Sequence, residues 1–186
     1  MSKRVIVIGG SAGSFSVITR ILAVLPNNFN ANIILCLHRL KHVRKGFSEA
    51  LSMISKNPII EPFDKEKMKS GQIYLVPSNY HLYVSNDNSF ILSIEESVNH
   101  SRPSIDITFA SVADVYKNKV VGILLSGANT DGAYGLKKIK DLGGTTIVQK
   151  PEECQVNTMP LSALKLCNSH QIMTSTEIID FILKQI

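Results

Sequence analysis

The sequence predicts an α/β fold, a three-layer, doubly wound, mainly parallel sheet with helices on both faces and an antiparallel hairpin. Short apolar runs alternate along the chain with longer segments of helical periodicity. Two of these runs, residues 5–8 and 120–125, are almost wholly apolar and rich in β-branched side chains, which is typical of strands buried on both faces of a parallel sheet. Each leads through a glycine-containing turn into a helical segment, so right-handed crossovers are expected.

The elements expected in the first half of the chain follow from these patterns. The strand at 5–8 ends at a glycine pair, and apolar residues then recur at helical spacing until Pro26 stops the helix. Two short apolar runs flanking the polar residues 85–89 indicate a hairpin, expected to join one part of the sheet. In chain order, we expect a strand at 5–8, a helix at 15–25, a strand at 33–37, a helix at 47–54, strands at 59–63 and 73–77, and hairpin strands at 82–84 and 90–92.

The second half repeats the alternation of strand and helix. A helical pattern precedes the buried run at 120–125, and the next helix is closed by Gly143-Gly144, because glycine readily adopts the left-handed conformation that ends helices. In chain order, we expect a helix at 105–116, a strand at 120–125, a helix at 134–142, a strand at 145–149 and helices at 160–167 and 175–186.

Length and composition indicate one domain over residues 1–186. The chain is 44% hydrophobic and 19% charged, which is ordinary for a globular domain with its own core. The net charge of +5 favours an acidic partner but is too small to indicate nucleic acid. Aromatic residues make up 6% of the chain and tryptophan is absent, which argues against a surface that stacks on bases. We therefore expect no nucleic-acid partner.

Cysteine usage and the amino terminus indicate a cytoplasmic protein. Cys36, Cys154 and Cys167 are odd in number and widely spaced, with no zinc-binding pattern and no disulfide framework. Only four apolar residues follow Met1–Arg4 before the glycine pair, which is too short for a signal peptide. No run approaches the roughly 18 apolar residues of a membrane-spanning helix. We expect no membrane insertion, no metal and no cofactor.

The turn after the first strand has three interpretations. Gly9-Gly10-Ser11-Ala12-Gly13 matches the G-x-S-x-G pattern of a nucleophile elbow, in the strand–turn–helix context that the pattern requires. A phosphate site is less well supported, because Ile8 stands where a dinucleotide fingerprint needs its first glycine and no lysine completes a P-loop. The third interpretation is that Ser11 only caps the following helix. The turn by itself leaves all three open.

Three polar groups are expected at the carboxyl ends of neighbouring strands, where parallel α/β sheets bind ligands. A serine nucleophile needs a base, and the base needs a carboxylate to hold it. Of the five histidines, only His38 directly follows a buried strand. Asp131 lies in the turn after the strand at 120–125, and the alternative interpretation is that it only caps the next helix. The simplest prediction is a catalytic triad of Ser11, His38 and Asp131.

Several short segments resemble a known family. They resemble, in order and over nearly the whole chain, the catalytic domain of the chemotaxis protein-glutamate methylesterases of the CheB type. The segments are Gly9-Gly10-Ser11-Ala12-Gly13, His38, Gly71-Gln72-Ile73-Tyr74-Leu75-Val76-Pro77, His81-Leu82, Arg102-Pro103-Ser104-Ile105-Asp106, Leu125-Ser126-Gly127, Asp131-Gly132-Ala133, Gly143-Gly144, Gln149 and Met159-Pro160.

The resemblance implies a serine hydrolase that removes methyl groups from glutamate methyl esters of chemoreceptors and often deamidates receptor glutamines. It implies Ser11 as nucleophile, His38 as base and Asp131 as the orienting carboxylate. Backbone N–H groups near Ala12 and Ala128 would form the oxyanion hole. A methylated chemoreceptor or a similar signalling protein is the expected partner.

The sequence departs from the family pattern close to the site. Ser14 stands where the family usually has glycine, and Ser126-Gly127-Ala128-Asn129 replaces Thr-Gly-Met-Gly. Asn129 would restrict its loop if that position needs a positive φ. These departures leave two alternatives open: a related ester hydrolase of altered specificity and an inactive binding module in a signalling complex. A nucleotide-binding domain is a third alternative, disfavoured because the glycine fingerprint fails at Ile8.

Two further expectations concern partners and regulation. The basic segment 39–45, directly after His38, is expected either to contact an acidic receptor surface or to form a solvated face. Because only residues 1–4 precede the first strand, we expect no receiver domain in this chain. The cleft would then be open, and activity would not depend on phosphorylation of this chain. Control would come from a separate regulatory chain, from expression or from substrate availability.

Overall fold

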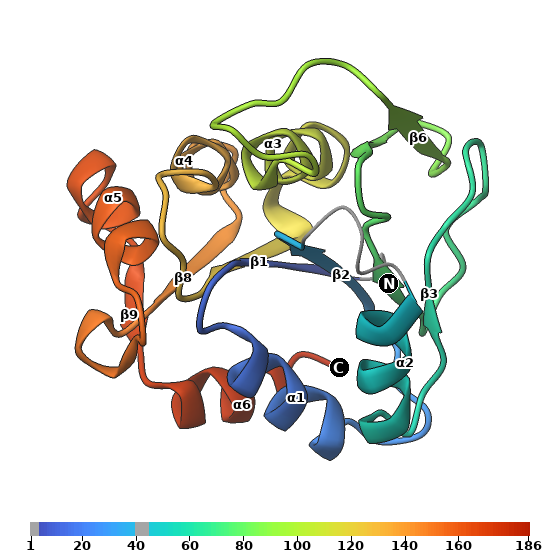
Figure 1. The fold of residues 1–186 in the computed structure, drawn as a ribbon, viewed down its shortest axis with the longest axis horizontal. Helices are drawn as coiled ribbons and strands as arrows, with labels where there is room; N and C mark the ends of the chain where they lie inside the picture. The colour runs from blue at the N-terminus through green and yellow to red at the C-terminus, as the bar shows by residue number, and fades with distance from the viewer. Residues whose placement is uncertain (1–3, 40–44) are drawn as a thin grey trace.

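A computed structural model of the chain describes residues 4–39 and 45–186. Its main feature is a seven-stranded sheet in the order β3-β4-β2-β1-β7-β8-β9, in which all neighbouring strands run parallel (Figure 1). The predicted parallel sheet is therefore confirmed. The strands are β1 (Val5–Gly10), β2 (Asn32–Leu37), β3 (Ile59–Ile60), β4 (Ile73–Leu75), β7 (Val120–Leu124), β8 (Thr145–Gln149) and β9 (Gln171–Met173).

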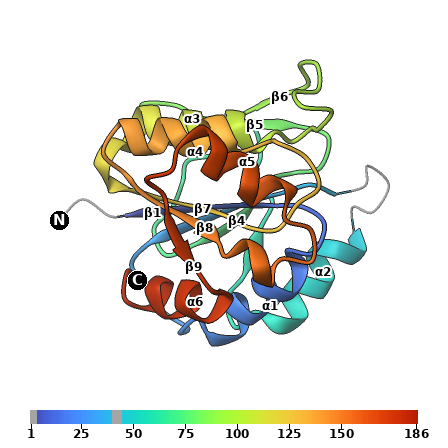
Figure 2. The same ribbon diagram turned by 90° about the vertical axis from the view of Figure 1, so that its left-hand side faces the viewer.

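Helices cover both faces of the sheet, which confirms the three-layer, doubly wound architecture. One face carries α1 (Phe15–Val24), α2 (Lys45–Ile54) and α6 (Ser175–Leu183) (Figure 1). The other face carries α3 (Ile105–Tyr116), α4 (Ala133–Asp141) and α5 (Thr158–Leu166), and Figure 2 shows the two helical layers from the side. Two short 3₁₀ turns, η1 (Lys117–Lys119) and η2 (Pro151–Glu153), complete these elements. Among the described residues, no helix is long and apolar enough to span a membrane.

The core is divided by the sheet, because successive side chains of a strand point to opposite faces. Val5 and Val7 of β1 belong to the cluster beneath α3, α4 and α5, whereas Ile6 and Ile8 belong to the cluster on the α1 and α6 side. All six residues of β1 are buried. This explains why the first strand reads as a continuous apolar run, since both of its faces pack against helices.

The hairpin was expected to join the main sheet, and this expectation is wrong. β5 (His81–Val84) and β6 (Phe90–Ser93) form a separate two-stranded antiparallel sheet. Side chains of α3 bind the backbone of β5 where a neighbouring strand would otherwise bind. Ser111 Oγ accepts a hydrogen bond from Val84 N at 2.7 Å, and Thr108 Oγ1 donates to Leu82 O at 3.2 Å. The hairpin is therefore held on the helix.

Other differences lie at the ends of elements. Gly9 and Gly10 are the last residues of β1, paired with Cys36 and Leu37 of β2, so the turn begins later than expected. β3 has two residues instead of five. The edge strand β9 was not predicted, since it has only three residues and no clear alternation. Helix α5 begins at Thr158, and Pro160 lies in its first turn, where a missing N–H is tolerated.

The central position of β1 brings the predicted site together. β1 lies between β2 and β7, and the residues at its carboxyl end remain paired with both neighbouring strands. His38 N donates to Gly10 O at 3.1 Å, and Ser11 N donates to Ser126 O at 2.9 Å. Ser11, His38 and the loop after β7 thus meet at the same edge of the sheet.

Candidate active site

Ser11 lies in a tight turn between β1 and α1. Its carbonyl oxygen accepts hydrogen bonds from Ser14 N at 3.1 Å and from Ser14 Oγ at 2.7 Å. Gly13 has a φ of +84°, which glycine adopts without strain. The residue at the N-cap of α1 is Ser14, not Ser11. The interpretation of Ser11 as a helix cap is therefore wrong, and its half-buried side chain has no structural task of that kind.

The backbone after β7 packs closely against Ser11. A Cβ atom on Gly127 would lie 3.1 Å from Ser11 Cβ and 2.5 Å from Met159 Cε, so a larger residue there would require the Met159 side chain to move. The preceding hydroxyl, Ser126 Oγ, donates to Ala12 O at 2.7 Å and to Val156 O at 2.9 Å. These contacts join the turn that contains Ser11, the loop after β7 and the segment before α5, and so fix the surroundings of Ser11.

His38 and Asp131 form a hydrogen-bonded pair. His38 Nε2 lies 2.8 Å from Asp131 Oδ2, and the Asp131 side chain is fully buried. Because an ionised carboxylate can only accept, Nε2 carries the hydrogen, and Nδ1 of the neutral ring carries the lone pair. The pair has the form of a base held by its orienting carboxylate.

The lone pair of His38 faces an unexpected hydroxyl. Nδ1 lies 3.3 Å from Ser101 Oγ, which is placed to donate to it. Among the hydrogen bonds of residues 4–39 and 45–186, none joins Ser11 Oγ to His38, so the expected contact between nucleophile and base is not formed in this structure. Sequence reasoning did not identify Ser101, because it lies in a polar loop without periodicity or motif. Hydrogen bonds in substrate-free active sites are often loose and tighten on binding.

The Asp131 carboxylate lies at the N-terminus of α3. Oδ2 also accepts from Ile105 N at 2.6 Å, and Oδ1 accepts from Asp106 N at 3.1 Å, from Ser104 Oγ at 2.9 Å and from Asn99 Nδ2 at 3.2 Å. The first N–H groups of a helix have no partner within the helix and carry partial positive charge. Asp131 therefore caps α3, and its interpretation as a cap of α4 is wrong.

The two carboxylates at this helix terminus have opposite shifts. Burial by itself raises the pKa of Asp131, but hydrogen bonds from His38 and Ile105 N outweigh it, and the pKa falls below the ordinary 3.8. Burial raises the pKa of Asp106 to about 6, opposed by the hydrogen bond from Gly135 N, while the negative charge of Asp131 raises it further. Asp131 is thus ionised at neutral pH, as an orienting carboxylate must be.

Gly9 and His81 help to place the N-terminus of α3 at the site. A Cβ atom on Gly9 would lie 2.4 Å from Ile105 Cγ2, so glycine allows the N-terminus of α3 to approach the end of β1. His81 is fully buried, and its Nδ1 accepts from Ser104 N at 3.1 Å while its Nε2 donates to Glu96 O at 2.9 Å. His81 thereby supports the backbone from which Ser104 reaches Asp131.

The residues predicted for the oxyanion hole are open to solvent. Ala12 and Ala128 are exposed, and neither backbone N–H group donates a hydrogen bond to another of the described residues. Asn129 is not among the described residues with positive φ, so the expected restriction of this loop does not arise. Its side chain instead links the loops, since Nδ2 donates to Ser101 Oγ at 3.2 Å and Oδ1 accepts from Asp131 N at 3.2 Å.

Arg39 does not belong to a basic surface, contrary to expectation. Its side chain is only 1% exposed and pairs with Glu61 at 2.9 Å. It also donates to Val76 O at 2.6 Å and lies over the ring of Phe47, 5.3 Å from the centroid. Residues 40–44 and the side chain of Lys45 lie outside the described part of the chain. The predicted acidic-surface contact of segment 39–45 therefore loses Arg39 as a contributor.

The chain is similar to known proteins over nearly its whole length. A family model described as CheB methylesterase matches residues 6–182. The chain belongs to the CheB methylesterase family. A CheB methylesterase catalytic domain from Thermotoga maritima, known from a crystal structure, superposes with a TM-score of 0.93 over 100% of both chains at 30% sequence identity.

Relatives within the CheB methylesterase family differ in length. A putative protein-glutamate methylesterase/protein-glutamine glutaminase of Leptospira interrogans is 38% identical over 184 residues, which cover 99% of this chain and 95% of the relative. The corresponding Thermotoga maritima protein is 33% identical over 172 residues, covering 89% of this chain but 49% of the relative. The chain thus spans nearly all of one relative and about half of the other.

Proposed function

We propose that this chain is a serine hydrolase that removes methyl groups from glutamate methyl esters of chemoreceptors. The observation that carries the proposal is the 2.8 Å hydrogen bond between His38 and buried Asp131, at the sheet edge where Ser11 follows β1. Membership of the CheB methylesterase family and the names of its relatives support the same reaction.

In the proposed acylation step, Ser11 Oγ attacks the ester carbonyl carbon while its proton passes to Nδ1 of His38. Asp131 stabilises the imidazolium through the hydrogen bond at Nε2. The negative oxygen of the tetrahedral intermediate accepts hydrogen bonds from the N–H groups of Ala12 and Ala128. The intermediate then collapses, the carbon–oxygen bond to the methoxy group breaks, and His38 returns the proton to release methanol.

Deacylation repeats these roles with water as the nucleophile. His38 removes a proton from water, the hydroxide attacks the acyl-enzyme, and the proton returns to Ser11 Oγ as the glutamate carboxylate leaves. The same steps on a glutamine side chain release ammonia in place of methanol. The double names of the relatives, methylesterase and glutaminase, support this second reaction for the same site.

The proposal requires a local rearrangement on substrate binding. In the substrate-free structure Ser101 Oγ lies 3.3 Å from His38 Nδ1 and is placed to donate a hydrogen bond to its lone pair. Rotation of the Ser11 or Ser101 hydroxyl group is a small movement about one side-chain bond. Substrate entering the cleft would displace Ser101 and bring Ser11 Oγ within hydrogen-bond reach of Nδ1.

The experiment is release of labelled methanol from receptor membranes carrying methyl-labelled glutamates. We expect the wild-type protein to release methanol and Ser11→Ala to release none above background, with an unchanged circular dichroism spectrum. Activity that persists unaltered in Ser11→Ala would remove Ser11 from the mechanism. A folded wild-type protein that binds these membranes but releases no methanol would instead support the alternative of a binding module.

Partner and location are proposed on the same basis. The proposed partner is a methylated chemoreceptor or similar signalling protein, with no nucleic acid, and the proposal includes a separate chain as one source of regulation. All three cysteines are described and free, with Cys36 buried. Free thiols are maintained in reducing compartments, which supports a cytoplasmic location.

A further inference from the structure

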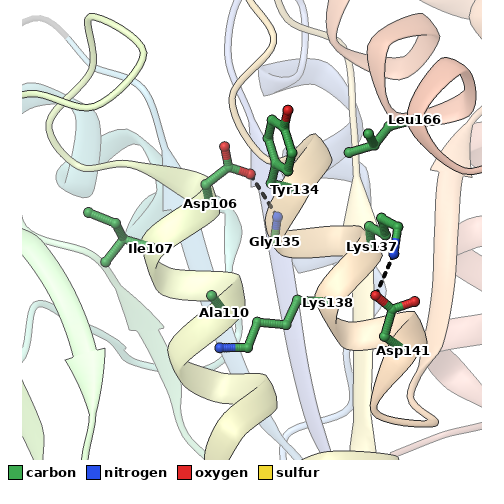
Figure 3. Close-up of a pocket in the computed structure, with 9 residues that line it drawn as sticks. All are labelled: Asp106, Ile107, Ala110, Tyr134, Gly135, Lys137, Lys138, Asp141 and Leu166. Carbon is green, nitrogen blue, oxygen red and sulfur yellow. Dashed lines mark hydrogen bonds and ion pairs between the residues drawn. The ribbon is translucent and has the colours of Figure 1, made fainter.

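Asp106 and Asp131 cap each other's helices. Asp131 precedes α4 and accepts from the first N–H groups of α3, as described above. Asp106 lies in the first turn of α3, and its Oδ1 accepts from Gly135 N, in the first turn of α4, at 2.8 Å (Figure 3). A Cβ atom on Gly135 would lie 2.8 Å from Asp106 O, so glycine permits this close approach of the two helices. The position of each carboxylate therefore depends on the other.

Asn99 links the two carboxylates directly. Its Nδ2 donates to Asp106 Oδ2 at 3.0 Å and to Asp131 Oδ1 at 3.2 Å. Both partners can only accept when ionised, so the amide satisfies them in one orientation, with its two hydrogens directed to the two carboxylates. Without an acceptor at Asp106, the Asn99 amide keeps its hydrogen bond to Asp131 but loses the second contact that fixes its orientation. Asp106 thus fixes the amide that occupies Oδ1 of Asp131 and leaves Oδ2 for His38.

Asp106 keeps this position at the expense of stability. Its folded-state pKa of about 6 lies above the ordinary 3.8 of an unfolded chain, mainly because of burial. A group of this kind favours the folded state below its unfolded pKa, and that contribution is lost as the pH rises through about 6. Ionisation of Asp106 therefore makes the folded state less stable at neutral pH than near pH 4. A carboxylate held beside a second carboxylate in a site is more typical of function than of structure.

Among residues 4–39 and 45–186, no cationic side chain forms an ion pair with Asp106. It lies at one end of a groove of about 550 Å³ between α3 and α4 (Figure 3). The charged groups of α4 that line this groove are already paired, since Lys137 binds Asp141 at 2.5 Å and Lys138 binds Asp114 of α3 at 2.6 Å. Asp131, across Asn99, carries the same sign of charge. The groove also gives Asp106 access to solvent protons without unfolding.

We propose that Asp106 is a positioning residue that acts through Asn99 and the first turn of α4 to hold Asp131 against His38. The inference rests on the proposed function for its effect on catalysis. Asp106 does not touch the substrate or the reacting atoms. It is distinguished from a merely structural residue because its removal is expected to raise stability at neutral pH while lowering the rate.

The first test replaces Asp106 by asparagine, which keeps an oxygen for Gly135 N but loses the charge that orients Asn99. We expect kcat to fall about 10- to 100-fold with KM within about threefold, as for small displacements of a catalytic group. The Tm should rise by at least about 3 °C near pH 7.5, and this gain should vanish near pH 4, where Asp106 is protonated in the folded protein. Asp114→Asn is the matched control, an exposed carboxylate two turns along α3, for which wild-type kcat is expected.

The second test asks whether Asp106 acts through Asn99. We expect Asn99→Ala to lower kcat about as much as Asp106→Asn, and the double variant to lose no more than about twofold beyond either single variant. Additive losses would show that the two residues act independently and would overturn the proposed route. A fall in both Tm and kcat of Asp106→Asn near pH 7.5 would assign Asp106 a structural role instead.

A spectroscopic measurement separates this proposal from the proposed function. The Nε2 proton shared by His38 and Asp131 should give a strongly downfield proton resonance in the wild-type protein and in Asp114→Asn. We expect it to be lost or broadened in Asp106→Asn. If the wild-type protein hydrolyses no methyl ester, the proposed function fails, yet this resonance still tests Asp106. An unchanged resonance in folded Asp106→Asn would overturn the positioning role.

Discussion

His38 Nδ1 and Ser101 Oγ lie 3.3 Å apart, so the base nitrogen of the candidate site faces Ser101 in the substrate-free structure. Two serines thus compete for one histidine. Ser11 has the turn geometry of a nucleophile, with its N–H bound to Ser126 O and its neighbour Ala12 free to donate. Ser101 lies in a loop and is bound by Asn129 Nδ2 at 3.2 Å. The two can be separated by substitution.

Ser101→Ala should retain hydrolysis, with kcat within about threefold of wild type, because Ser101 would only occupy Nδ1 until substrate arrives. Ser11→Ala should lose at least about 1,000-fold, as expected when a nucleophile is removed. Steady-state kinetics on a methylated receptor substrate would measure both. A large loss in Ser101→Ala together with a small loss in Ser11→Ala would reverse the assignment.

Asp131→Asn should reduce kcat by about 10,000-fold, since the neutral amide cannot hold the same histidine tautomer or stabilise an imidazolium. Stability should fall too, by about 3 kcal/mol near neutral pH, because a buried network of charged hydrogen bonds is broken. Its folded pKa is lowered, so this contribution is present above the ordinary 3.8 and is lost as the pH falls below it.

Urea unfolding of wild type and Asp131→Asn at several pH values would measure this dependence. The difference in unfolding free energy should be largest near neutral pH and should shrink progressively below pH 3.8. A difference independent of pH would show that the lost packing, not the carboxylate charge, accounts for the effect.

Arg39→Gln should destabilise the fold by about 2 kcal/mol, because it leaves Glu61 without its partner and Val76 O without a donor. The loss of unfolding free energy is expected to be smaller than for a fully buried ion pair, because Glu61 is 35% exposed. Thermal unfolding would measure it, and Lys67→Gln, which removes an exposed partner of Asp87 at 3.8 Å, is the control expected to change little. Equal stability of the two variants would contradict the buried role of Arg39.

The remaining basic residues of segment 39–45 should govern salt dependence. Charges near the surface are screened over about 8 Å at physiological ionic strength, so binding to an acidic receptor surface weakens with salt. We expect a triple change of Lys41, Arg44 and Lys45 to glutamine to flatten this dependence, with Arg39 left intact to preserve the fold. Receptor binding at several salt concentrations is the measurement. If binding depended on salt concentration equally in the wild type and the triple variant, the segment would be interpreted as a solvated face instead.

Much of the fold was predictable because burial on both faces of a parallel sheet leaves a direct pattern in the chain. The runs at 5–8, 33–37 and 120–125 had to be apolar on every residue, and β1, β2 and β7 follow them. The hairpin was predicted as a pair of strands but not as a separate sheet, since its attachment depends on Thr108 and Ser111 of α3. The edge strand β9 has a neighbouring strand on one side only, and its residues do not form a recognisable strand pattern in the sequence.

The positions of Ser11, His38 and Asp131 at one edge of the sheet follow from the sequence, because all strands of a parallel sheet end at the same side. Which of their atoms meet depends on the tertiary packing. Asn99, Ser101 and Asp106 come from a loop and a helix start whose paths follow from packing over the whole domain, and hydrogen bonds require placement within a few tenths of an ångström. Periodicity sets which face a residue occupies, but not that placement. For this reason the sequence predicted the pairing of His38 with Asp131. It predicted neither the contact of His38 with Ser101 nor the link from Asp106 to Asp131.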